Sequence, residues 1–463
     1  MSSNNLPTEF RVLMHRILQS EMPAFEHALS QNCPVSIRAN SQKASTEEFS
    51  HLNISESVPW CSDGYYLDTR PSFTLDPLFH SGCYYVQEAS SMFIGYLLKK
   101  FFSSHPVHIL DLCAAPGGKS THILSEMPEG SLLFANEIIR SRCNILIENI
   151  IKWGNPNVIV TNNSSEDYKS SGVYFDIILC DAPCSGEGMF RKEAQSLSEW
   201  SVSNVSMCSL RQREILHNIW DCLKPGGLLI YSTCTYNTDE DECNAQYIKH
   251  ELGGKPLFYK IDDAWGIVTT NYLKYDTPVY HFFPHKIKGE GFFTCLFQKP
   301  LGSQCLSNKK PHKKDKKNHI NNRSKELQSW IKDSNNYHFI SNDNGELYAI
   351  NKNHQGIIHN CEKKLRVLHK GIKLASLKGK KYTPSHSLAM STIFNPEKFP
   401  SVELDLSSAL SYLHCDSLRL PDAPRGHILV KYKGHPLGFV NNVGNHANNL
   451  YPQEWRIRMN ITT

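Results

Sequence analysis

Between residues 107 and 300, short runs of apolar residues alternate with longer stretches in which apolar residues recur at helical spacing. The short runs predict strands at residues 107–112, 132–136, 158–161, 175–180, 228–232 and 292–297. The longer stretches predict helices at residues 120–127, 138–152, 204–223 and 239–251. Strands that alternate with helices in this way are typical of an α/β fold, a parallel, doubly wound, Rossmann-like sheet with helices on both faces.

The two ends of the chain follow other patterns. Near the N-terminus, apolar residues at helical spacing predict a helical extension: Phe10, Leu13, Met14, Ile17 and Leu18. Near the C-terminus, residues 429–440 alternate between apolar and polar and turn at Gly434, which favours a β-hairpin. We therefore expect residues 326–463 to form a second, smaller α+β or β-rich unit.

Charge is distributed unevenly along the chain. The length of 463 residues predicts two or three domains, and the net charge is only +4. Residues 309–325, however, carry eight Lys or Arg against one Asp. Such a basic tract attracts polyanions such as nucleic acids. A solvated linker without any partner has the same composition, so both interpretations stay open and we place a basic linker at residues 301–325.

Several classes of protein are disfavoured by what the sequence lacks. It has no run of 18 or more apolar residues, and it does not begin like a secretory signal. We therefore expect a cytoplasmic monomer without a membrane partner. Disulfides are disfavoured in the cytoplasm, and the fifteen cysteines include no Cys-x-x-Cys pair, so we expect no metal site. Most of these cysteines are then expected to be small buried hydrophobes.

A glycine-bearing turn follows the first predicted strand, from Asp111 to Lys119. Cys113 stands where a phosphate-binding P-loop has its first glycine, and the Gly-x-Gly-x-x-Gly pattern of dinucleotide sites is absent. Glu137 comes directly after the second predicted strand, where a carboxylate can accept hydrogen bonds from ribose hydroxyls. The combination favours S-adenosylmethionine as the cofactor, with a plain strand-to-helix turn as the alternative.

Two cysteines follow predicted strands of the same sheet. Cys184 comes shortly after Asp181, and Cys234 follows the next predicted strand along the chain. Because the carboxyl ends of parallel strands meet at one edge of a sheet, we expect the two thiols and the carboxylate to lie close together. A thiolate that adds to carbon-6 of a pyrimidine activates carbon-5 toward an electrophilic methyl group. The sequence therefore predicts covalent chemistry on a pyrimidine, with buried core cysteines as the alternative.

The motifs that carry these residues resemble those of a known family. They read CAAPGGK at 113–119, DAPCSGEG at 181–188 and KPGGLLIYSTCT at 224–235. These segments resemble the signature motifs of the Sun-type RNA cytosine-5 methyltransferases. The C-terminal segment 444–458 is similar to the tail of the bacterial RsmF/YebU-like branch, which methylates small-subunit ribosomal RNA.

The resemblance implies a role for each motif residue. It implies that Cys234 is the nucleophile, that Cys184 assists product release and that Asp181 contacts the base. It also implies that one set of residues holds S-adenosylmethionine, comprising Asp181 and Cys113, Ala114, Ala115, Pro116, Gly117, Gly118, Lys119 and Glu137. The implied domains are an RNA-binding extension at 1–80, a methyltransferase domain at 81–300, and an RNA-binding region at 326–463 that ends in a PUA-like module.

Two positions depart from the family pattern. Where the family often has an aspartate after the third strand, this chain has Asn162, Asn163 and Ser164. Where the family has an arginine before a Pro-His pair, this chain has His281. The alternatives to an RNA cytosine-5 methyltransferase are an RNA-binding ribosome-assembly factor with a vestigial cofactor site and an enzyme that acts on transfer RNA. A protein or small-molecule methyltransferase is a third.

Overall fold

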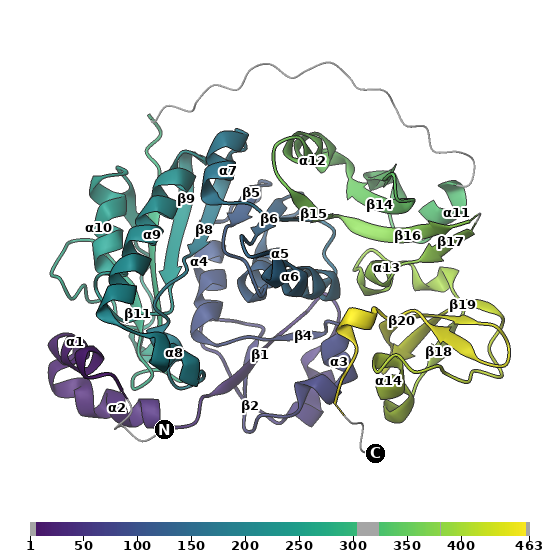
Figure 1. The fold of residues 1–463 in the computed structure, drawn as a ribbon, viewed down its shortest axis with the longest axis horizontal. Helices are drawn as coiled ribbons and strands as arrows, with labels where there is room; N and C mark the ends of the chain where they lie inside the picture. Colours follow the sequence, from purple (N-terminus) through teal and green to yellow (C-terminus); the bar gives the residue numbers. More distant parts are fainter. Residues whose placement is uncertain (1–5, 303–323, 380, 460–463) are drawn as a thin grey trace.

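The computed structural model describes residues 6–302, 324–379 and 381–459, and its centre is one large mixed sheet (Figure 1). The strands lie in the order β10-β12-β9-β8-β5-β6-β7-β15, and β11 pairs with β12. Their bounds are β5 His108–Asp111, β6 Leu132–Asn136, β7 Val158–Thr161, β8 Phe175–Asp181, β9 Leu223–Thr233, β10 Lys255–Leu257, β11 Tyr280–Phe282, β12 Phe292–Gln298 and β15 Val367–Lys370. All six strands expected between residues 107 and 300 are confirmed.

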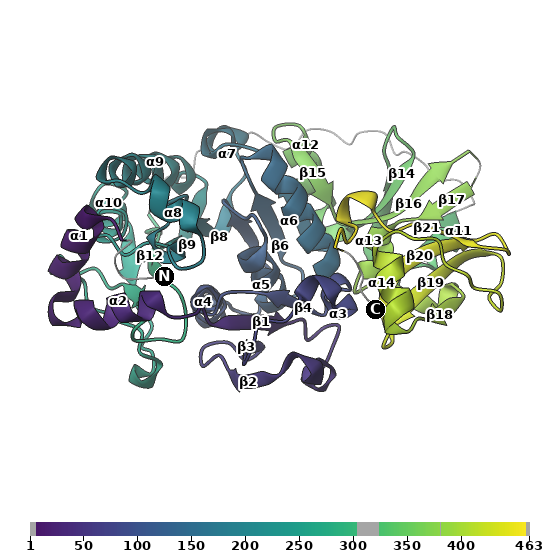
Figure 2. The same cartoon turned by 60° about the horizontal axis from the view of Figure 1, so that its bottom comes forward.

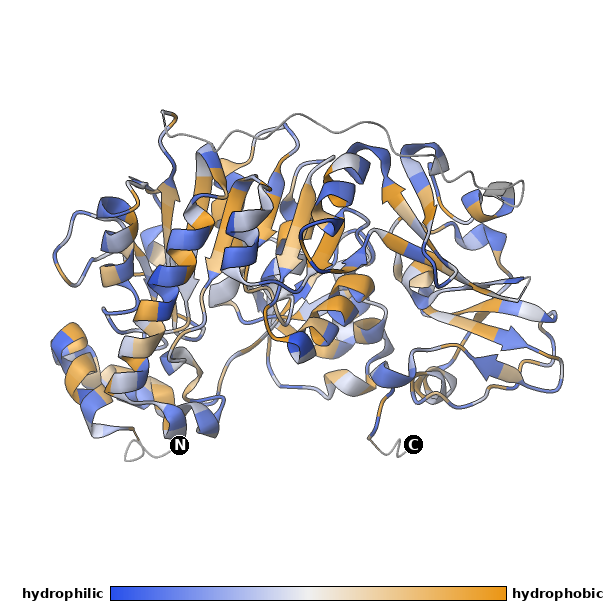
Figure 3. Ribbon diagram, turned by 45° about the horizontal axis from the view of Figure 1, so that its top comes forward, coloured by the Kyte–Doolittle hydropathy of each residue, from blue (hydrophilic) through white to orange (hydrophobic). Residues whose placement is uncertain are grey.

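Helices cover both faces of this sheet, as the doubly wound pattern predicts. Two separate apolar clusters, one per face, include residues of α4, α5 and α6 in the first and of α7, α9, α10 and α12 in the second. The helices are α4 Phe93–Phe101, α5 Gly118–Glu126, α6 Arg140–Trp153, α7 Ser165–Ser171, α9 Val202–Trp220, α10 Glu242–His250 and α12 Gln355–Glu362. Burial on both faces explains the unbroken apolar runs of the strands, which Figure 3 shows as largely hydrophobic.

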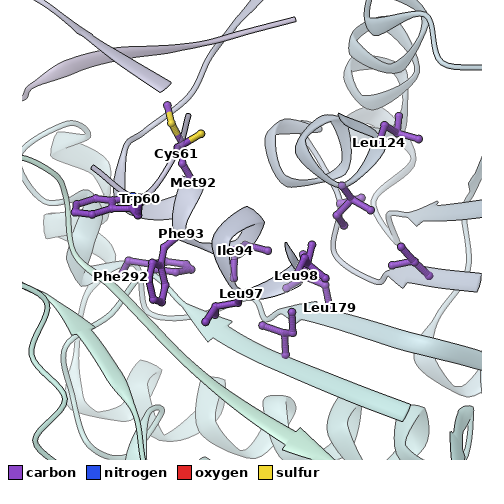
Figure 4. Packing of buried hydrophobic residues seen from close by; sticks show 14 of the residues in the cluster. Trp60, Cys61, Met92, Phe93, Ile94, Leu97, Leu98, Leu124, Leu179 and Phe292 are labelled. Atoms are coloured by element: carbon purple, nitrogen blue, oxygen red, sulfur yellow. The ribbon is translucent and has the colours of Figure 1, made fainter. Parts of the chain in front are cut away.

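The first cluster joins the sheet to the N-terminal part of the chain. Figure 4 shows Phe93 and Leu97 of α4 packed near Phe292 of β12, with Trp60 beside them. Trp60 also donates its indole N–H to the carbonyl of Ala89 at 2.7 Å. The aromatic rings thus pack the N-terminal extension against the central sheet.

The direction of some strands differs from the prediction of a parallel sheet. β5 to β9 pair in parallel, but β12 runs antiparallel to β9, and β15 runs antiparallel to β7. An apolar run is the same in either direction, so the sequence pattern alone could not show this. β15 also comes from the C-terminal region, so one sheet contains strands from both sides of the predicted linker.

The N-terminal extension contains the predicted helix and an unpredicted sheet. Helix α1 spans Thr8–Leu18, buries Phe10, Met14 and Leu18, and is followed by α2, Met22–Ser30. A four-stranded sheet of order β2-β3-β1-β4 then lies beneath the central sheet (Figure 2). Its strands are β1 Val35–Ala39, β2 Ile54–Ser57, β3 Gly64–Leu67 and β4 Tyr84–Val86.

The described residues of the C-terminal region form two four-stranded sheets, which fits the expected α+β or β-rich unit (Figures 1 and 2). Their orders are β13-β14-β16-β17 and β18-β19-β20-β21. The strands are β13 Tyr337–Ser341, β14 Glu346–Asn351, β16 Ile372–Lys378, β17 Lys381–Pro384, β18 Ser401–Glu403, β19 Gly426–Tyr432, β20 His435–Asn442 and β21 Ala447–Asn449. The expected hairpin is β19–β20, and both turn residues, Lys433 and Gly434, have positive φ. Most of the predicted basic linker, at 303–323, lies outside the described residues.

Among the described residues, no helix is both long enough and apolar enough to cross a membrane. The cytoplasmic location and the monomeric state stay predictions.

Replacing the buried Phe25 of α2 with alanine should lower the free energy of unfolding by about 3 to 5 kcal/mol, because the ring fills a core position. It packs edge-on against Tyr236 at 5.1 Å between ring centroids. Urea unfolding followed by circular dichroism measures the change. Val12→Ala, on the half-exposed face of α1, is the control and should cost less than about 0.5 kcal/mol. Equal costs for the two variants would contradict the packing of α2 on the enzyme core.

Candidate active site

The two predicted strand-end cysteines meet at one edge of the central sheet. β8 and β9 are parallel neighbours, and Asp181 at the end of β8 pairs with Ser232 near the end of β9. This register brings the Sγ atoms of Cys184 and Cys234 to 3.1 Å. Both residues are half-buried rather than sealed in the core. The interpretation of both as inert core cysteines therefore does not fit the structure.

Two buried glutamates hold the loops that carry these thiols. Glu187, in the loop after β8, accepts hydrogen bonds from the backbone N–H groups of Tyr236 and Asn237, in the loop after β9, at 2.8 and 3.0 Å. Glu240 accepts from the N–H of Ser185 at 3.0 Å and from the side chain of Asn237 at 2.8 Å. Each carboxyl group thus ties one cysteine loop to the other.

Sequence reasoning did not identify this pair of glutamates. Burial raises the pKa of Glu187 to about 7, and burial also raises the pKa of Glu240, although both carboxyl groups accept several hydrogen bonds. Glu187 lies inside the DAPCSGEG motif, and that position was the available signal. For Glu240, the acidic run at 239–242 gives no hint, because solvated acidic runs look the same.

The N-terminal helices support the same loops from outside. Phe10 of α1 packs edge-on against Phe190 at 5.0 Å, six residues beyond Cys184. Arg191, the residue after Phe190, donates a hydrogen bond to the carbonyl of Ala28 at 3.0 Å. It also forms an ion pair with Glu290 at 2.7 Å. The helices α1 and α2 therefore hold the loop after Cys184 in place.

Gly188 allows the two cysteine loops to approach each other closely. Its N–H donates to the carbonyl of Cys234 at 2.8 Å. A Cβ atom at this position would lie 2.5 Å from the carbonyl oxygen of Gly291 and 3.0 Å from that of Cys234. Only glycine fits between these backbones, so any larger residue would push the loops apart.

Asp181 and Lys119 form an ion pair beside the thiols. Lys119 Nζ lies 2.7 Å from Asp181 Oδ2, and the hydroxyl of Ser232 donates to Asp181 Oδ1 at 2.8 Å. Burial lowers the pKa of Lys119, but the attraction and hydrogen bond of Asp181 outweigh it, so the net pKa is raised. Lys119 thus keeps its positive charge and also interacts electrostatically with Cys234.

The Cys184 thiol holds its proton firmly. The hydrogen bond with Cys234 raises the pKa of Cys184 well above its ordinary value, and burial raises it further. Cys184 therefore carries its proton at neutral pH and can donate a hydrogen bond to the sulfur of Cys234.

The predicted cofactor turn leads into helix α5. Gly117 has φ of 116° and caps the helix at its N-terminus, where backbone N–H groups favour polar or anionic ligands. The turn is held open by side chains: Arg142 donates to the carbonyl of Ala115 at 2.8 Å, and Asn149 donates to that of Pro116 at 2.9 Å. Burial raises the pKa of the Cys113 thiol well above its ordinary value, so this cysteine is a neutral part of the turn.

Glu137 comes directly after β6. Its Oε1 accepts from the N–H of Ile139 at 2.9 Å, while Oε2 is buried and receives no hydrogen bond but forms an ion pair with Arg142, whose Nη1 lies 3.1 Å away. The next two side chains, Ile138 and Ile139, are 63% and 49% exposed. A buried carboxylate oxygen that receives no hydrogen bond, beside exposed apolar side chains, fits a ribose hydroxyl and an adenine ring. The residues present therefore fit S-adenosylmethionine.

The positions that depart from the family pattern bind other parts of this protein. Asn163 bonds to the backbone of Arg366, from the C-terminal region, and Ser164 caps helix α7. His281 is buried against Glu242 at 3.2 Å. Within the described ranges, no group of three or more His, Cys, Asp or Glu residues could hold a metal ion.

The sheet order, the cofactor turn after β5 and the acidic residue after β6 define an S-adenosylmethionine-dependent methyltransferase. Three family models match successive parts of the chain. They are 16S rRNA methyltransferase RsmB/F at residues 103–298, the N-terminal domain of 16S rRNA methyltransferase RsmF at 6–89, and the methyltransferase RsmF PUA domain at 399–457. Along most of its length the chain is thus similar to the RsmF branch of this methyltransferase family.

Curated relatives and solved structures agree with this assignment. The chain is 29% identical to ribosomal RNA small subunit methyltransferase F of Enterobacter sp. (strain 638), over 98% of this chain and 97% of the relative. It is 33% identical to the protein of that name from Pectobacterium atrosepticum, over 64% and 63%. A methyltransferase homologue from Pyrococcus horikoshii is 26% identical, with a TM-score of 0.55 over 63% of this chain and 95% of that one. NSun6 of the same organism, solved with SFG, shares the fold, with a TM-score of 0.55, 20% identity and coverage of 64% and 99%.

Asp111 makes stability depend on pH. Burial raises its pKa from 3.8 to about 7, despite a 2.6 Å hydrogen bond from Ser120. Between these two values the folded protein retains a proton that the unfolded chain has lost, so the free energy of unfolding falls as pH rises through this window.

We therefore expect Asp111→Asn to flatten this fall by on the order of 1 kcal/mol per pH unit between about pH 4 and 7. Urea unfolding of both proteins across this range measures the difference. A variant that keeps the slope of the parent protein would show that Asp111 ionises normally in the fold.

Proposed function

We propose that the protein transfers a methyl group from S-adenosylmethionine to carbon-5 of a cytosine in RNA, through a covalent intermediate with Cys234. The contact between the two sulfurs, 3.1 Å apart and beside the Asp181–Lys119 pair, carries this proposal. A protein or small-molecule methyltransferase would need neither a second thiol nor this ion pair. A vestigial cofactor site would not need a buried carboxylate oxygen at Glu137 that receives no hydrogen bond.

Carbon-5 of cytosine is a weak nucleophile, and the site supplies what it lacks. The Cys234 thiolate forms a bond to carbon-6 of the ring, and the electron pair displaced toward carbon-5 makes that atom nucleophilic. When bound, S-adenosylmethionine supplies the electrophilic methyl group. Lys119 and Asp181 are assigned to the ring edge, where the N–H of Lys119 stabilises the negative charge that develops on the base.

Cys184 acts in the release of the product. After methyl transfer, the carbon-5 proton leaves to a base, the carbon-6–sulfur bond breaks, and Cys234 departs as a thiolate. Because Cys184 keeps its proton and lies 3.1 Å away, its S–H can donate a hydrogen bond to that departing thiolate. This role requires the proton that the raised pKa of Cys184 preserves.

We propose small-subunit ribosomal RNA as the substrate. The relatives that align along most of the chain carry the name ribosomal RNA small subunit methyltransferase F. The match to a PUA domain at 399–457 and the N-terminal domain match at 6–89 support RNA contacts on both sides of the catalytic sheet. We therefore propose that residues 1–80 and 326–463 are RNA-binding units. The catalytic unit, residues 81–300, lies between them in the sequence.

The two cysteine variants should differ in kind. We expect Cys234→Ala to lower methyl transfer by on the order of 10⁴-fold or more and to form no adduct, because the nucleophile is gone. Cys184→Ala should accumulate a protein–RNA adduct that survives a denaturing gel. Gel shift with labelled RNA and methyl incorporation measure both.

Cys243→Ala is the matched control, since this half-buried cysteine of α10 lies outside the sulfur pair. It should behave like the parent protein. An adduct in Cys234→Ala and none in Cys184→Ala would reverse the two roles.

The substrate is tested in cells. Bisulfite sequencing of ribosomal and transfer RNA from a strain that lacks the protein should show the loss of a protected cytosine in small-subunit ribosomal RNA. Complementation with the parent gene, and not with the Cys234→Ala gene, should restore it. Loss of protection in transfer RNA instead would overturn the substrate assignment and leave the chemistry intact.

A further inference from the structure

The edge of the catalytic sheet nearest the cofactor turn is completed by the C-terminal region. β15 pairs antiparallel with β7, so that Val367 lies opposite Thr161. The pairing continues beyond the end of β7: the N–H of Asn162 donates to the carbonyl of Arg366 at 3.0 Å. The side chain of Asn163 then accepts from the N–H of Arg366 at 3.0 Å and donates to its carbonyl at 3.3 Å.

The same two asparagines hold the segments that face the cofactor. The side chain of Asn162 donates to the carbonyls of Glu137 and Ile138, both at 2.8 Å, and so fixes the turn that carries the acidic residue. The backbone of Asn163 is held on both sides by the side chain of Asn136, at 3.0 and 2.9 Å.

Asn136 passes this connection on to the cofactor turn. The side chain of Asn136 donates to the carbonyl of Leu112 at 3.0 Å. The backbone carbonyl of Asn136 accepts from the N–H of Ala114 at 2.8 Å. A continuous set of hydrogen bonds therefore runs from the backbone of Arg366 to the glycine-bearing turn. Asn136 and Asn163 are both buried, so each lost bond would leave a polar group unpaired away from water.

Packing ties the same C-terminal segment to the sheet. Ile358 and Cys361 of α12, with Leu365 after it, belong to the apolar cluster that contains Leu110 and Leu112 at the start of the cofactor turn. Separation of this segment would expose that cluster and break the hydrogen bonds together. An asparagine suits position 163 because its amide both donates and accepts, whereas a carboxylate would only accept.

We propose that residues 355–370 are a structural part of the cofactor site, and that Asn163 is the positioning residue that couples them to it. The cofactor and the docking of this segment are then linked, so each stabilises the other by the same factor. The inference depends on the cofactor and not on which atom of the RNA is methylated.

The first test measures cofactor binding directly. Asn163→Ala should weaken the binding of S-adenosylhomocysteine about 10-fold or more in calorimetry, and raise KM for S-adenosylmethionine with little change in kcat at saturation. Asn163→Asp keeps the 3.0 Å bond from the N–H of Arg366 but loses the 3.3 Å bond to its carbonyl, so its affinity should lie between those of Asn163→Ala and the parent protein. Ser164→Ala, which removes only the cap of α7, is the control for lost stability and should bind like the parent protein.

The second test excludes a direct contact between Asn163 and the cofactor. Arg366→Pro removes the N–H that donates to the side chain of Asn163, so it should weaken cofactor binding as Asn163→Ala does. The double variant should bind the cofactor no more weakly than either single variant. Thermal unfolding establishes that each variant folds. An unchanged affinity in a folded Arg366→Pro protein would overturn the coupling.

The third test uses hydrogen exchange in the full chain. S-adenosylhomocysteine should slow exchange of backbone amides in residues 355–371 of the parent protein, and should fail to do so in Asn163→Ala. Exchange in this segment that ignores the ligand in the parent protein would also overturn the inference. Neither outcome depends on RNA methylation, so the proposed function is tested separately.

Discussion

The alignment of β8 with β9 is the constraint on which the site depends. In-register backbone pairing runs from Ile177 opposite Leu228 to Asp181 opposite Ser232 and leaves both strands ending together. A slip of one residue would move one loop by about 3.3 Å, which is more than the whole distance between the two sulfurs. The contact between the sulfurs of Cys184 and Cys234, on which the proposed chemistry depends, therefore requires this backbone register.

The loops beyond these strands are not held by backbone pairing between strands. Side-chain hydrogen bonds and aromatic packing hold them instead. Glu187 and Glu240 cross-link the loops from inside, and the aromatic side chains of α1 and α2 support them from outside. Buried carboxyl groups are costly, but here each receives several donors from backbone and side chains that would otherwise be unpaired. The N-terminal helices thus contribute to the precision of the thiol contact.

The parts that the sequence predicts are those in which local pattern and tertiary position agree. Buried strands such as β8 are apolar throughout, and the cysteine motifs follow them directly, so the strand ends and the thiols were accessible to reasoning from the chain. β15 was not, because four residues with a histidine and a lysine among them give no strand pattern. The small N-terminal sheet was missed for a similar reason, since its strands are only three to five residues long. The roles of Glu187, Glu240 and Asn163 depend on partners that only the folded chain brings together.

The covering of β7 by β15 has a consequence for how this protein is made. β7 is a short, wholly buried run of β-branched residues, Val158–Thr161, and such a strand readily pairs with other chains when its edge is open. During synthesis this edge stays unpaired until β15, which begins at Val367, has left the ribosome. A fragment that stops at the end of β12 would expose an aggregation-prone edge, so the smallest well-behaved unit of this protein extends beyond its two cysteine motifs into the C-terminal region.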